Sequence, residues 1–292
     1  MKWCEIGLKK NLRNDTLVAF LQKNAVASEF QFIEATQENF KDKLTEAKSQ
    51  FEVIRIHPAL MHLASQTIDR SFQELVRMGT VDTLIKQQDK FWPESLLRES
   101  MFQFLTSKVK NMDVQQEALV IGACGVSRAV AAALIKLGFS QINITSDSVE
   151  KINEMADDFK KIYFNTHFKT TPKEELTLLP GVHGIVVNTF DFDESEDFLN
   201  DLYFFNFLKK GGWAIDFSDV PLETPFIHIA KDIEAHTVSG YEFNSFYDMI
   251  FVQKVFGKVL GVNDYKDHLK QDLEKATYDK DKYQKILTEF QV

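Results

Sequence analysis

The chain has 292 residues, of which 44% are hydrophobic and 26% are charged, and its formal net charge is −9 at pH 7. This length predicts one large domain or two of ordinary size, with enough apolar material for packed cores. The acidic charge and the lack of a Lys/Arg-rich block argue against nucleic-acid binding, because contacts to phosphate backbones need clustered Lys and Arg.

The sequence shows no sign of a signal peptide, a membrane helix or a disulfide framework. Residues 1–5 lack the apolar run of a signal peptide. No stretch reaches the roughly 18 to 20 uninterrupted apolar residues that a membrane helix needs. The two cysteines, Cys4 and Cys124, fall in different predicted elements and offer no disulfide framework. We therefore expect a cytoplasmic protein that does not bind a membrane.

The first part of the chain is predicted to alternate strands and helices. The apolar run 51–56 reads as a strand that ends before Pro58, and Gly79 ends a helix that begins at Ser65. Apolar segments on either side of the polar residues 86–90 predict a hairpin. The expected strands are 3–7, 29–33, 51–56, 81–85 and 91–92, and the expected helices are 16–24, 40–49, 65–78 and 94–108.

From residue 118 onward the alternation becomes more regular. The expected strands are 118–121, 141–145, 161–164, 184–187, 213–217 and 235–238, and the expected helices are 126–137, 148–159, 195–208 and 225–233, with two more after Gly240. This βα order predicts a parallel, doubly wound sheet. The fold class is therefore two α/β domains with a cleft between them: residues 1–110 form a substrate-type domain, residues 111–239 a Rossmann-like dinucleotide-type domain, and residues 240–292 return to the first.

A glycine-containing turn joins the first strand of the second part to its first helix. Gly122, Cys124 and Gly125 lie in this turn, and the helix begins near Val126. Strand, turn, helix and strand in this order aim backbone N–H groups at an anion, which is typical of dinucleotide-binding βαβ units. The position where the backbone must approach a pyrophosphate closely is Cys124 rather than glycine, so the fingerprint is incomplete.

Four short motifs follow one another along the chain. They are the segment 79–84, the segment 122–138, the set Asp216, Pro221, Thr224 and Pro225 with Asp219 at the position of a tyrosine, and the glycines Gly240 and Gly257, seventeen residues apart. In this order they resemble the shikimate/quinate dehydrogenase family. The resemblance implies an NAD(P)-dependent oxidoreductase that acts on an alcohol.

The acid–base pair that the resemblance implies is missing. Family members carry a lysine two residues after a proline and an aspartate on a following loop, which together move the proton of the substrate hydroxyl. The corresponding positions hold Leu60, and Leu97 or Arg98. No catalytic residue is therefore named for this chain, and shikimate turnover by the usual mechanism is not expected.

The substrate side is altered as well. The family's carboxylate-binding serines fall opposite Arg13 and Asp15, its substrate-binding asparagine opposite Asp82, and the glutamine of a late helix opposite Tyr247. We name Arg13, Asp82 and Tyr247 as candidate substrate residues, and a carboxylate at position 82 would suit a more cationic or hydroxyl-rich ligand. The alternative role for Asp82 is to cap a turn.

The cofactor side favours NAD over NADP. NADP-using relatives carry an arginine after the second strand that pairs with the 2′-phosphate, whereas this chain has Asp147, a carboxylate suited to a ribose diol. The alternative is that Asp147 is a solvated loop or helix-cap residue. The candidate cofactor residues are Gly122, Cys124, Gly125, Val126, Asp147, and Asn188 after the strand 184–187.

The histidines, the cysteine of the glycine-containing turn and the C-terminal tail indicate little about function. His57 and His62 are five residues apart, about 140° around a helix, and do not share a face as a zinc pair would, so no metal site is expected. His57 as a replacement acid or base, and Cys124 as a thiol of lowered pKa, remain alternatives to structural roles. The apolar stripe in the tail 265–290 is expected to pack on the first domain, with self-association as the alternative, so the chain is a monomer or a homodimer.

Two hypotheses of function follow. The first is a shikimate dehydrogenase-like NAD(P)-dependent oxidoreductase with an altered substrate, a small polar ligand held in the cleft. The second is a homologue that binds a ligand or a partner without catalysis. The missing lysine and aspartate favour the second hypothesis, and the resemblance favours the first.

Overall fold

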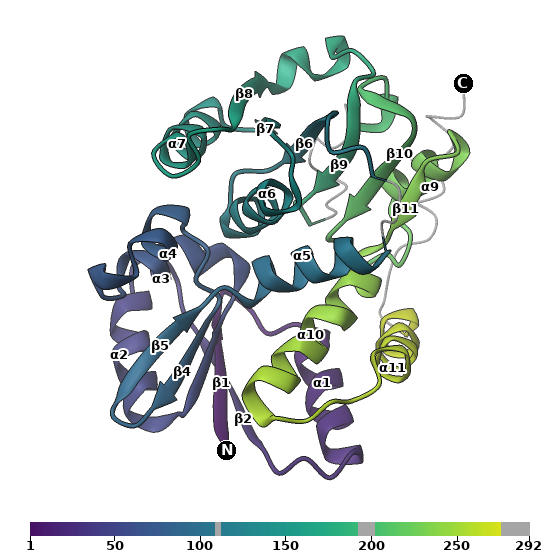
Figure 1. The fold of residues 1–292 in the computed structure, drawn as a ribbon. Coiled ribbons are helices and arrows are strands. Elements are labelled where there is room, and N and C mark those ends of the chain that lie inside the picture. The colour runs from purple at the N-terminus through teal and green to yellow at the C-terminus, as the bar shows by residue number, and fades with distance from the viewer. Residues whose placement is uncertain (109–111, 192–201, 276–292) are drawn as a thin grey trace. The chain divides into compact units, whose positions relative to one another are not determined.

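The computed structural model describes the chain of 292 residues except for residues 109–111, 192–201 and 276–292 (Figure 1). It divides into two compact units. The first contains residues 1–105, 124–133 and 245–269, and the second contains the described residues within 106–123, 134–244 and 270–292. The prediction of two α/β parts is thus confirmed, while the boundaries expected at residues 110 and 239 stay a prediction.

The first unit is built on a five-stranded sheet of order β2-β1-β3-β4-β5. Strands β1 (Lys2–Gly7), β2 (Glu29–Glu34) and β3 (Val53–Ile56) are parallel, and β1 lies between the other two. Strands β4 (Thr83–Gln87) and β5 (Lys90–Glu94) form an antiparallel hairpin at one edge, as the sequence predicts.

The helices among these strands agree with the predicted pattern except between residues 61 and 78. They are α1 (Leu12–Lys23), α2 (Phe40–Gln50), α3 (Met61–Gln66), α4 (Gln73–Met78) and α5 (Leu96–Lys108). Helix α1 begins four residues before the expected start, because the side chain of Asn11 accepts a hydrogen bond from Asn14 N and caps it there.

The single helix expected over 65–78 is wrong. Helix α3 ends at Gln66, where the Thr67 hydroxyl donates to Ala64 O, and the Asp69 side chain accepts from Ser71 N to start a short 3₁₀ turn. Short polar side chains of this kind offer the backbone alternatives to helical hydrogen bonds, so the apolar periodicity does not hold one helix together. Gly79, with φ of 70°, ends α4 as expected.

The second unit is built on a six-stranded sheet of order β11-β10-β9-β6-β7-β8, and all its strand pairs are parallel. Its strands are β6 (Glu117–Ile121), β7 (Gln141–Ser146), β8 (His167–Pro172), β9 (His183–Asn188), β10 (Leu208–Asp216) and β11 (His236–Val238). Strands β7 and β8 follow β6 outward on one side, and β9, β10 and β11 follow on the other side. This is the strand order of Rossmann folds. The predicted parallel sheet from 118–121, 141–145 and 184–187 is confirmed.

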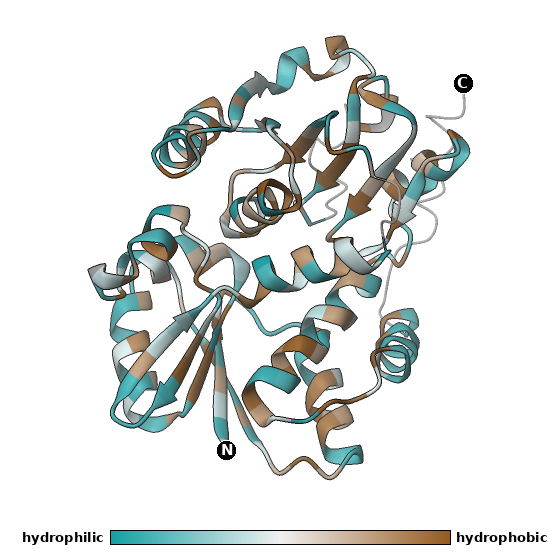
Figure 2. Ribbon diagram, in the orientation of Figure 1, coloured by the Kyte–Doolittle hydropathy of each residue, from teal (hydrophilic) through white to brown (hydrophobic). Residues whose placement is uncertain are grey.

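The remaining helices among the described residues are α6 (Gly125–Leu137), α7 (Val149–Lys160), α9 (Pro225–Asp232), α10 (Gly240–Phe256) and α11 (Val262–Glu274). Figure 2 shows that hydrophobic residues gather on the central strands of the six-stranded sheet. Leu119 and Val186 from β6 and β9 are fully buried there, with Phe226 and Ile227 of α9 packed in the same core cluster. In the described ranges, no helix combines the length and apolar character needed to cross a membrane.

Two predicted elements of this unit differ from the structure. Residues 161–164 form a turn after α7, with Phe164 86% exposed, and the strand comes later, at β8. Much of the helix expected over 195–208 lies outside the described residues. Within the described part, a 3₁₀ turn (Leu202–Phe204) is followed by Phe205 with φ of 49° and then by β10, so the chain is not an α-helix there.

Helix α10 starts at a glycine for a steric reason. A Cβ atom on Gly240 would lie 2.1 Å from the carbonyl oxygen of Ser218. Because that atom belongs to the backbone, it cannot move aside as a flexible side chain would. The Gly240 motif is therefore explained by a close backbone approach within the second unit.

Candidate functional site

The glycine turn after β6 lies where the order of the six-stranded sheet reverses. Gly122 has φ of 120°, which a residue with a side chain rarely adopts, and its N–H donates to Thr145 O of β7 at 2.7 Å. On the other side of β6, the Thr189 hydroxyl donates to Ile121 O at 2.7 Å. Ligands of open α/β sheets bind at the carboxyl ends of the strands at such a reversal point.

The start of α6 supplies the other half of this turn. Cys124 is exposed at the residue before the helix, and its N–H donates to the Ser127 hydroxyl at 3.1 Å. A side chain in the first turn that reaches back in this way satisfies one N–H of the helix start. Gly125 begins the helix and Val126 is buried. The thiol of Cys124 lies 3.5 Å from the same Ser127 oxygen.

Asp147 lies at the carboxyl end of β7, beside the turn strand. It is exposed, and one carboxylate oxygen accepts a hydrogen bond from Ser146 Oγ at 2.6 Å. The residue that caps α7 is Ser148, whose side chain accepts from Lys151 N. The helix-cap alternative for Asp147 is therefore wrong, while its exposure agrees with the solvated-loop alternative as well as with a cofactor role at the strand end that follows the glycine turn.

Asn188 is brought to the same sheet edge but is held by its neighbours. It is 3% exposed, and its side-chain amide donates to Asp216 Oδ1 at 3.1 Å and accepts from Phe190 N at 3.1 Å. Burial raises the pKa of Asp216 to about 6, against the opposing effect of hydrogen bonds from Thr224 and Ser218. This network holds the ends of β9 and β10 together, so Asn188 has a structural role.

In the first unit, the structure brings Arg13 and Tyr247 together. The Arg13 guanidinium lies 5.7 Å from the centre of the Tyr247 ring, and its Nε is 3.3 Å from Asp248 Oδ2. Burial raises the pKa of the Tyr247 hydroxyl, and the nearby Asp82 carboxylate adds to this effect. The three candidate substrate residues therefore belong to one neighbourhood.

A buried arginine completes this cluster, and the sequence reading missed it. Arg55 of β3 is 2% exposed, with Nη2 2.6 Å from Asp248 Oδ1 and Nε 3.7 Å from Glu5 Oε2. Its guanidinium also lies 4.6 Å from the centre of the Tyr247 ring. The available signal was a lone arginine inside the otherwise apolar run 53–56, because a buried charge needs a partner.

Asp82 acts as a helix cap. Its carboxylate accepts hydrogen bonds from the N–H groups of Leu96 and Leu97 at 3.0 and 2.5 Å, and from the Thr83 hydroxyl at 2.8 Å. Burial raises its pKa to about 6, although these hydrogen bonds and Arg55 oppose the shift. Both carboxylate oxygens are therefore engaged by the chain itself, which agrees with the capping alternative.

The resemblance places Leu60 at the position of the family's lysine, and Leu97 or Arg98 at that of its aspartate. Leu60 is fully buried and Leu97 is 3% exposed. His57, the alternative acid or base, accepts a hydrogen bond from Ala59 N through Nδ1 at 3.3 Å. In the described part of the chain, no group of three or more His, Cys, Asp or Glu side chains is placed to hold a metal ion.

Sequence comparison finds shikimate dehydrogenases among curated proteins, while no family model matches. The chain is 26% identical over 190 residues to "Shikimate dehydrogenase (NADP(+))" of Brucella abortus (strain S19), a match that covers 63% of this chain and 62% of that protein. It is 30% identical over 139 residues to the enzyme of the same name from Nitrobacter winogradskyi, covering 45% and 48%. The match thus spans less than two thirds of these relatives.

Structure comparison covers nearly the whole chain. A shikimate 5-dehydrogenase from Thermus thermophilus, solved with NADP(H) and shikimate, matches with a TM-score of 0.74 at 18% identity, covering 94% of this chain and all of that one. A quinate dehydrogenase from Corynebacterium glutamicum, solved with NAD, matches with a TM-score of 0.78 at 15% identity, covering 93% and 99%. In sequence the chain is thus similar to shikimate dehydrogenases, and in fold to shikimate and quinate dehydrogenases.

Proposed function

We propose that the protein binds a nicotinamide dinucleotide, NAD in preference to NADP, and is an alcohol oxidoreductase whose substrate is not shikimate. The observation that carries this proposal is the pairing of the Gly122 turn with an exposed Asp147 at the end of the neighbouring strand. The ligands of the Thermus and Corynebacterium structures, NADP(H) and NAD, support the choice of cofactor class.

The residues of the turn fit a pyrophosphate with one obstacle. Gly122 allows the tight turn, and the N–H groups at the start of α6 present a partial positive charge to an anion. The side chain of Cys124 occupies the position where a glycine would let a phosphate oxygen reach the backbone. We expect dinucleotide binding that is weakened but not abolished.

Asp147 supports the preference for NAD. A carboxylate at this strand end accepts hydrogen bonds from the two hydroxyls of an adenosine ribose. The same carboxylate repels the 2′-phosphate of NADP, and because Asp147 is exposed the repulsion is partly screened by solvent. We expect a preference of about tenfold, the size of a modest charge interaction near the surface.

An altered substrate follows from the side chains of the first unit. When bound, the dinucleotide supplies the hydride chemistry, and the protein has to hold or move the proton of the substrate hydroxyl. Leu60 and Leu97 cannot do so, and Asp82 is committed to the start of α5. The proposed reaction therefore uses a different proton acceptor from the family's lysine and aspartate.

Calorimetric titration with NAD and NADP tests the proposal. The wild type should bind both, NAD more tightly, and Asp147→Asn should reduce the difference between them. Asp157→Asn is the matched control, since Asp157 is another exposed aspartate, on α7, and pairs with Lys160 at 3.0 Å. An unchanged preference in Asp147→Asn would refute the role of Asp147, and no binding of either dinucleotide at millimolar concentration would refute the cofactor itself.

A second candidate function is ligand or partner binding without catalysis. It is favoured by one observation: Arg13, Asp82 and Tyr247 are all engaged by other groups of the first unit. Under this hypothesis no alcohol is oxidised with either dinucleotide. A panel of hydroxy acids and polyols, assayed for NADH and NADPH formation, separates the two functions, because turnover of any member contradicts the non-catalytic one.

A further inference from the structure

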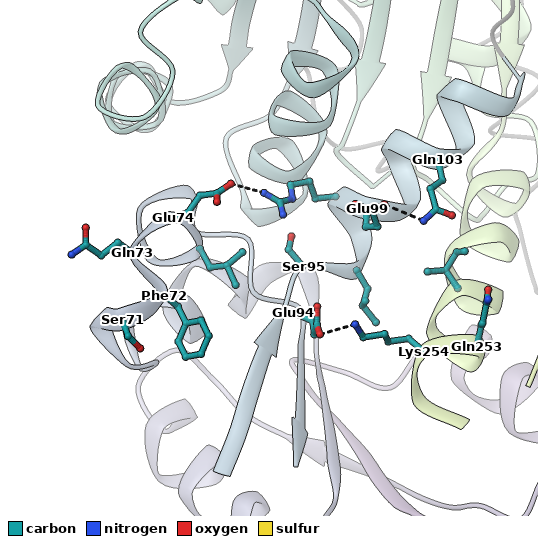
Figure 3. Close-up of a pocket in the computed structure, with 14 residues that line it drawn as sticks. Ser71, Phe72, Gln73, Glu74, Glu94, Ser95, Glu99, Gln103, Gln253 and Lys254 are labelled. Carbon is teal, nitrogen blue, oxygen red and sulfur yellow. Dashed lines mark hydrogen bonds and ion pairs between the residues drawn. The ribbon is translucent and has the colours of Figure 1, made fainter. Parts of the chain in front are cut away.

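A large pocket lies wholly within the first unit, away from the residues proposed for the dinucleotide. Its volume is about 1090 Å³, and its walls are residues 71–75, the end of β5, the first turns of α5 and part of α10. Figure 3 shows polar side chains from these four segments turned toward a common space. A volume of this order is in the range of small-molecule sites.

Two ion pairs cross the walls of the pocket. Lys254 Nζ of α10 lies 2.8 Å from Glu94 Oε1 of β5, and Arg98 Nη1 of α5 lies 3.0 Å from Glu74 Oε1 of α4 (Figure 3). A third carboxylate, Glu99, accepts a hydrogen bond from the side chain of Gln103 at 3.0 Å. The lining thus carries three acidic and two basic groups, so the pocket is not a basic site.

Two buried polar atoms of the lining have no hydrogen-bond partner among the described residues. They are the hydroxyl oxygen of Ser95, a residue only 6% exposed, and Nε of Arg98. A buried polar group without a partner destabilises the folded protein. Both atoms lie at the start of α5. On this side the pocket therefore carries an N–H donor, Arg98 Nε, and a hydroxyl, Ser95 Oγ, that make no hydrogen bond to the described residues.

The start of α5 is nevertheless not an anion site. The N–H groups of Leu96 and Leu97, which would face an anion, already donate to the carboxylate of Asp82. A negative ligand would meet the carboxylates of Glu74, Glu94 and Glu99, which line the pocket. A cationic ligand would have to compete with Lys254 and Arg98 for their partners.

We propose that this pocket binds a small, uncharged, polyhydroxylated molecule of the sugar or cyclitol class. Each hydroxyl group both donates and accepts, so one ring bearing several of them can satisfy Arg98 Nε, Ser95 Oγ and the remaining lone pairs of the carboxylates without separating either ion pair. Phe72 and Ile250 in the lining offer apolar surface to the C–H faces of such a ring. The site is independent of the proposed dinucleotide site and shares none of its residues.

Binding is tested in the absence of dinucleotide, by ligand-observed NMR and calorimetry with myo-inositol, D-glucose and quinate. Saturable binding of myo-inositol or glucose at millimolar concentration, tighter than that of quinate, is expected, and the two neutral probes separate a cyclitol from a sugar. Tighter binding of the quinate anion, or no saturable binding of either neutral probe at tens of millimolar, would overturn the proposal. Neither result bears on whether NAD binds.

Variants locate the site. Lys254→Gln and Ser95→Ala should each weaken binding of the neutral probe by about tenfold, the loss of one good hydrogen bond. Lys270→Gln is the matched control, because Lys270 pairs with Glu274 on α11, outside the pocket. Ser95→Ala should also leave the unliganded melting temperature unchanged or raised, since its hydroxyl has no partner to lose. Unchanged affinity in both pocket variants would place the ligand elsewhere and contradict the assignment.

Discussion

The carboxylate of Asp82 accepts a hydrogen bond from the N–H of Leu97 at 2.5 Å. The two residues lie fifteen positions apart, at β4 and α5, and each stands where the family resemblance places a polar group of the reaction. In this chain Asp82 caps α5 and Leu97 lies in the first turn of that helix, so their hydrogen bond contributes to the folding of the first unit.

Removal of the Asp82 carboxylate should destabilise the protein strongly. Asp82→Ala leaves the buried N–H groups of Leu96 and Leu97 without acceptors, which costs about 1–3 kcal/mol in free energy of unfolding. Urea unfolding at pH 7 measures the loss. The control is Asp89→Ala, a change at an exposed aspartate in the turn of the β4–β5 hairpin, which should change stability by less than about 0.5 kcal/mol. Equal stability of both variants would contradict the capping role.

Asp216 should make stability depend on pH. Burial raises its pKa to about 6 in the folded state, whereas an unfolded aspartate has a pKa of about 3.9. Between these values the folded protein holds more protons, so this group's contribution to the free energy of unfolding is full below pH 4 and falls as the pH rises to about 6, by on the order of 2–3 kcal/mol. Asp216→Asn should remove that part of the slope. Parallel pH profiles of wild type and variant would refute the shift.

The buried arginine of β3 should be among the most sensitive positions of the first unit. Arg55→Met removes the cation partner of Glu5 and one of the two arginine partners of Asp248, and leaves the buried Glu5 without its cation, which costs about 3–5 kcal/mol. Lys270→Met removes an exposed lysine from a surface pair and should cost less than about 1 kcal/mol. Chemical denaturation of the two variants gives the comparison, and a loss below about 1 kcal/mol for Arg55→Met would show that the cluster is not a tight ion pair.

Replacement of the cysteine in the turn tests the proposed obstacle to the cofactor. Cys124→Gly should tighten dinucleotide binding by about 1–2 kcal/mol, because the cysteine side chain no longer blocks the approach of a phosphate oxygen to the N–H groups at the start of α6. NAD should gain more than NADP, since Asp147 opposes the 2′-phosphate. Cys124→Ala is the matched control, and its dinucleotide affinity should lie between those of the wild type and Cys124→Gly. If Cys124→Gly binds neither dinucleotide at millimolar concentration, the non-catalytic function becomes the better one.

Shikimate should be turned over very slowly or not at all. General acid–base groups contribute about 10²- to 10⁴-fold each, and the corresponding positions hold Leu60, and Leu97 or Arg98, none of which is a carboxylate or a lysine. The measurement is formation of NADH or NADPH with saturating shikimate and then with quinate. A turnover near one to ten per second, typical of working enzymes, would show that another residue supplies the proton acceptor.

Local patterns were enough to predict the parallel sheet and the glycine turn. The strands at 118–121, 141–145 and 184–187 are short apolar runs bounded by turn residues, and their order after Gly122 leaves few topologies that right-handed crossovers allow. Asp147 could be placed at a strand end for the same reason. These features depend on neighbours within a few residues, and the sequence alone contains that information.

Partners that lie far apart along the chain could not be read in this way. Arg55 and Asp248 pair across 193 residues, and neither position by itself indicates the other. Asp82 was open to both substrate binding and capping until the start of α5 was placed beside it. Likewise, the sequence does not reveal that polar atoms of Ser95 and Arg98 are buried without a hydrogen-bond partner among the described residues. Burial and hydrogen-bond satisfaction are properties of packed elements, so they appear only when the tertiary structure brings those elements together.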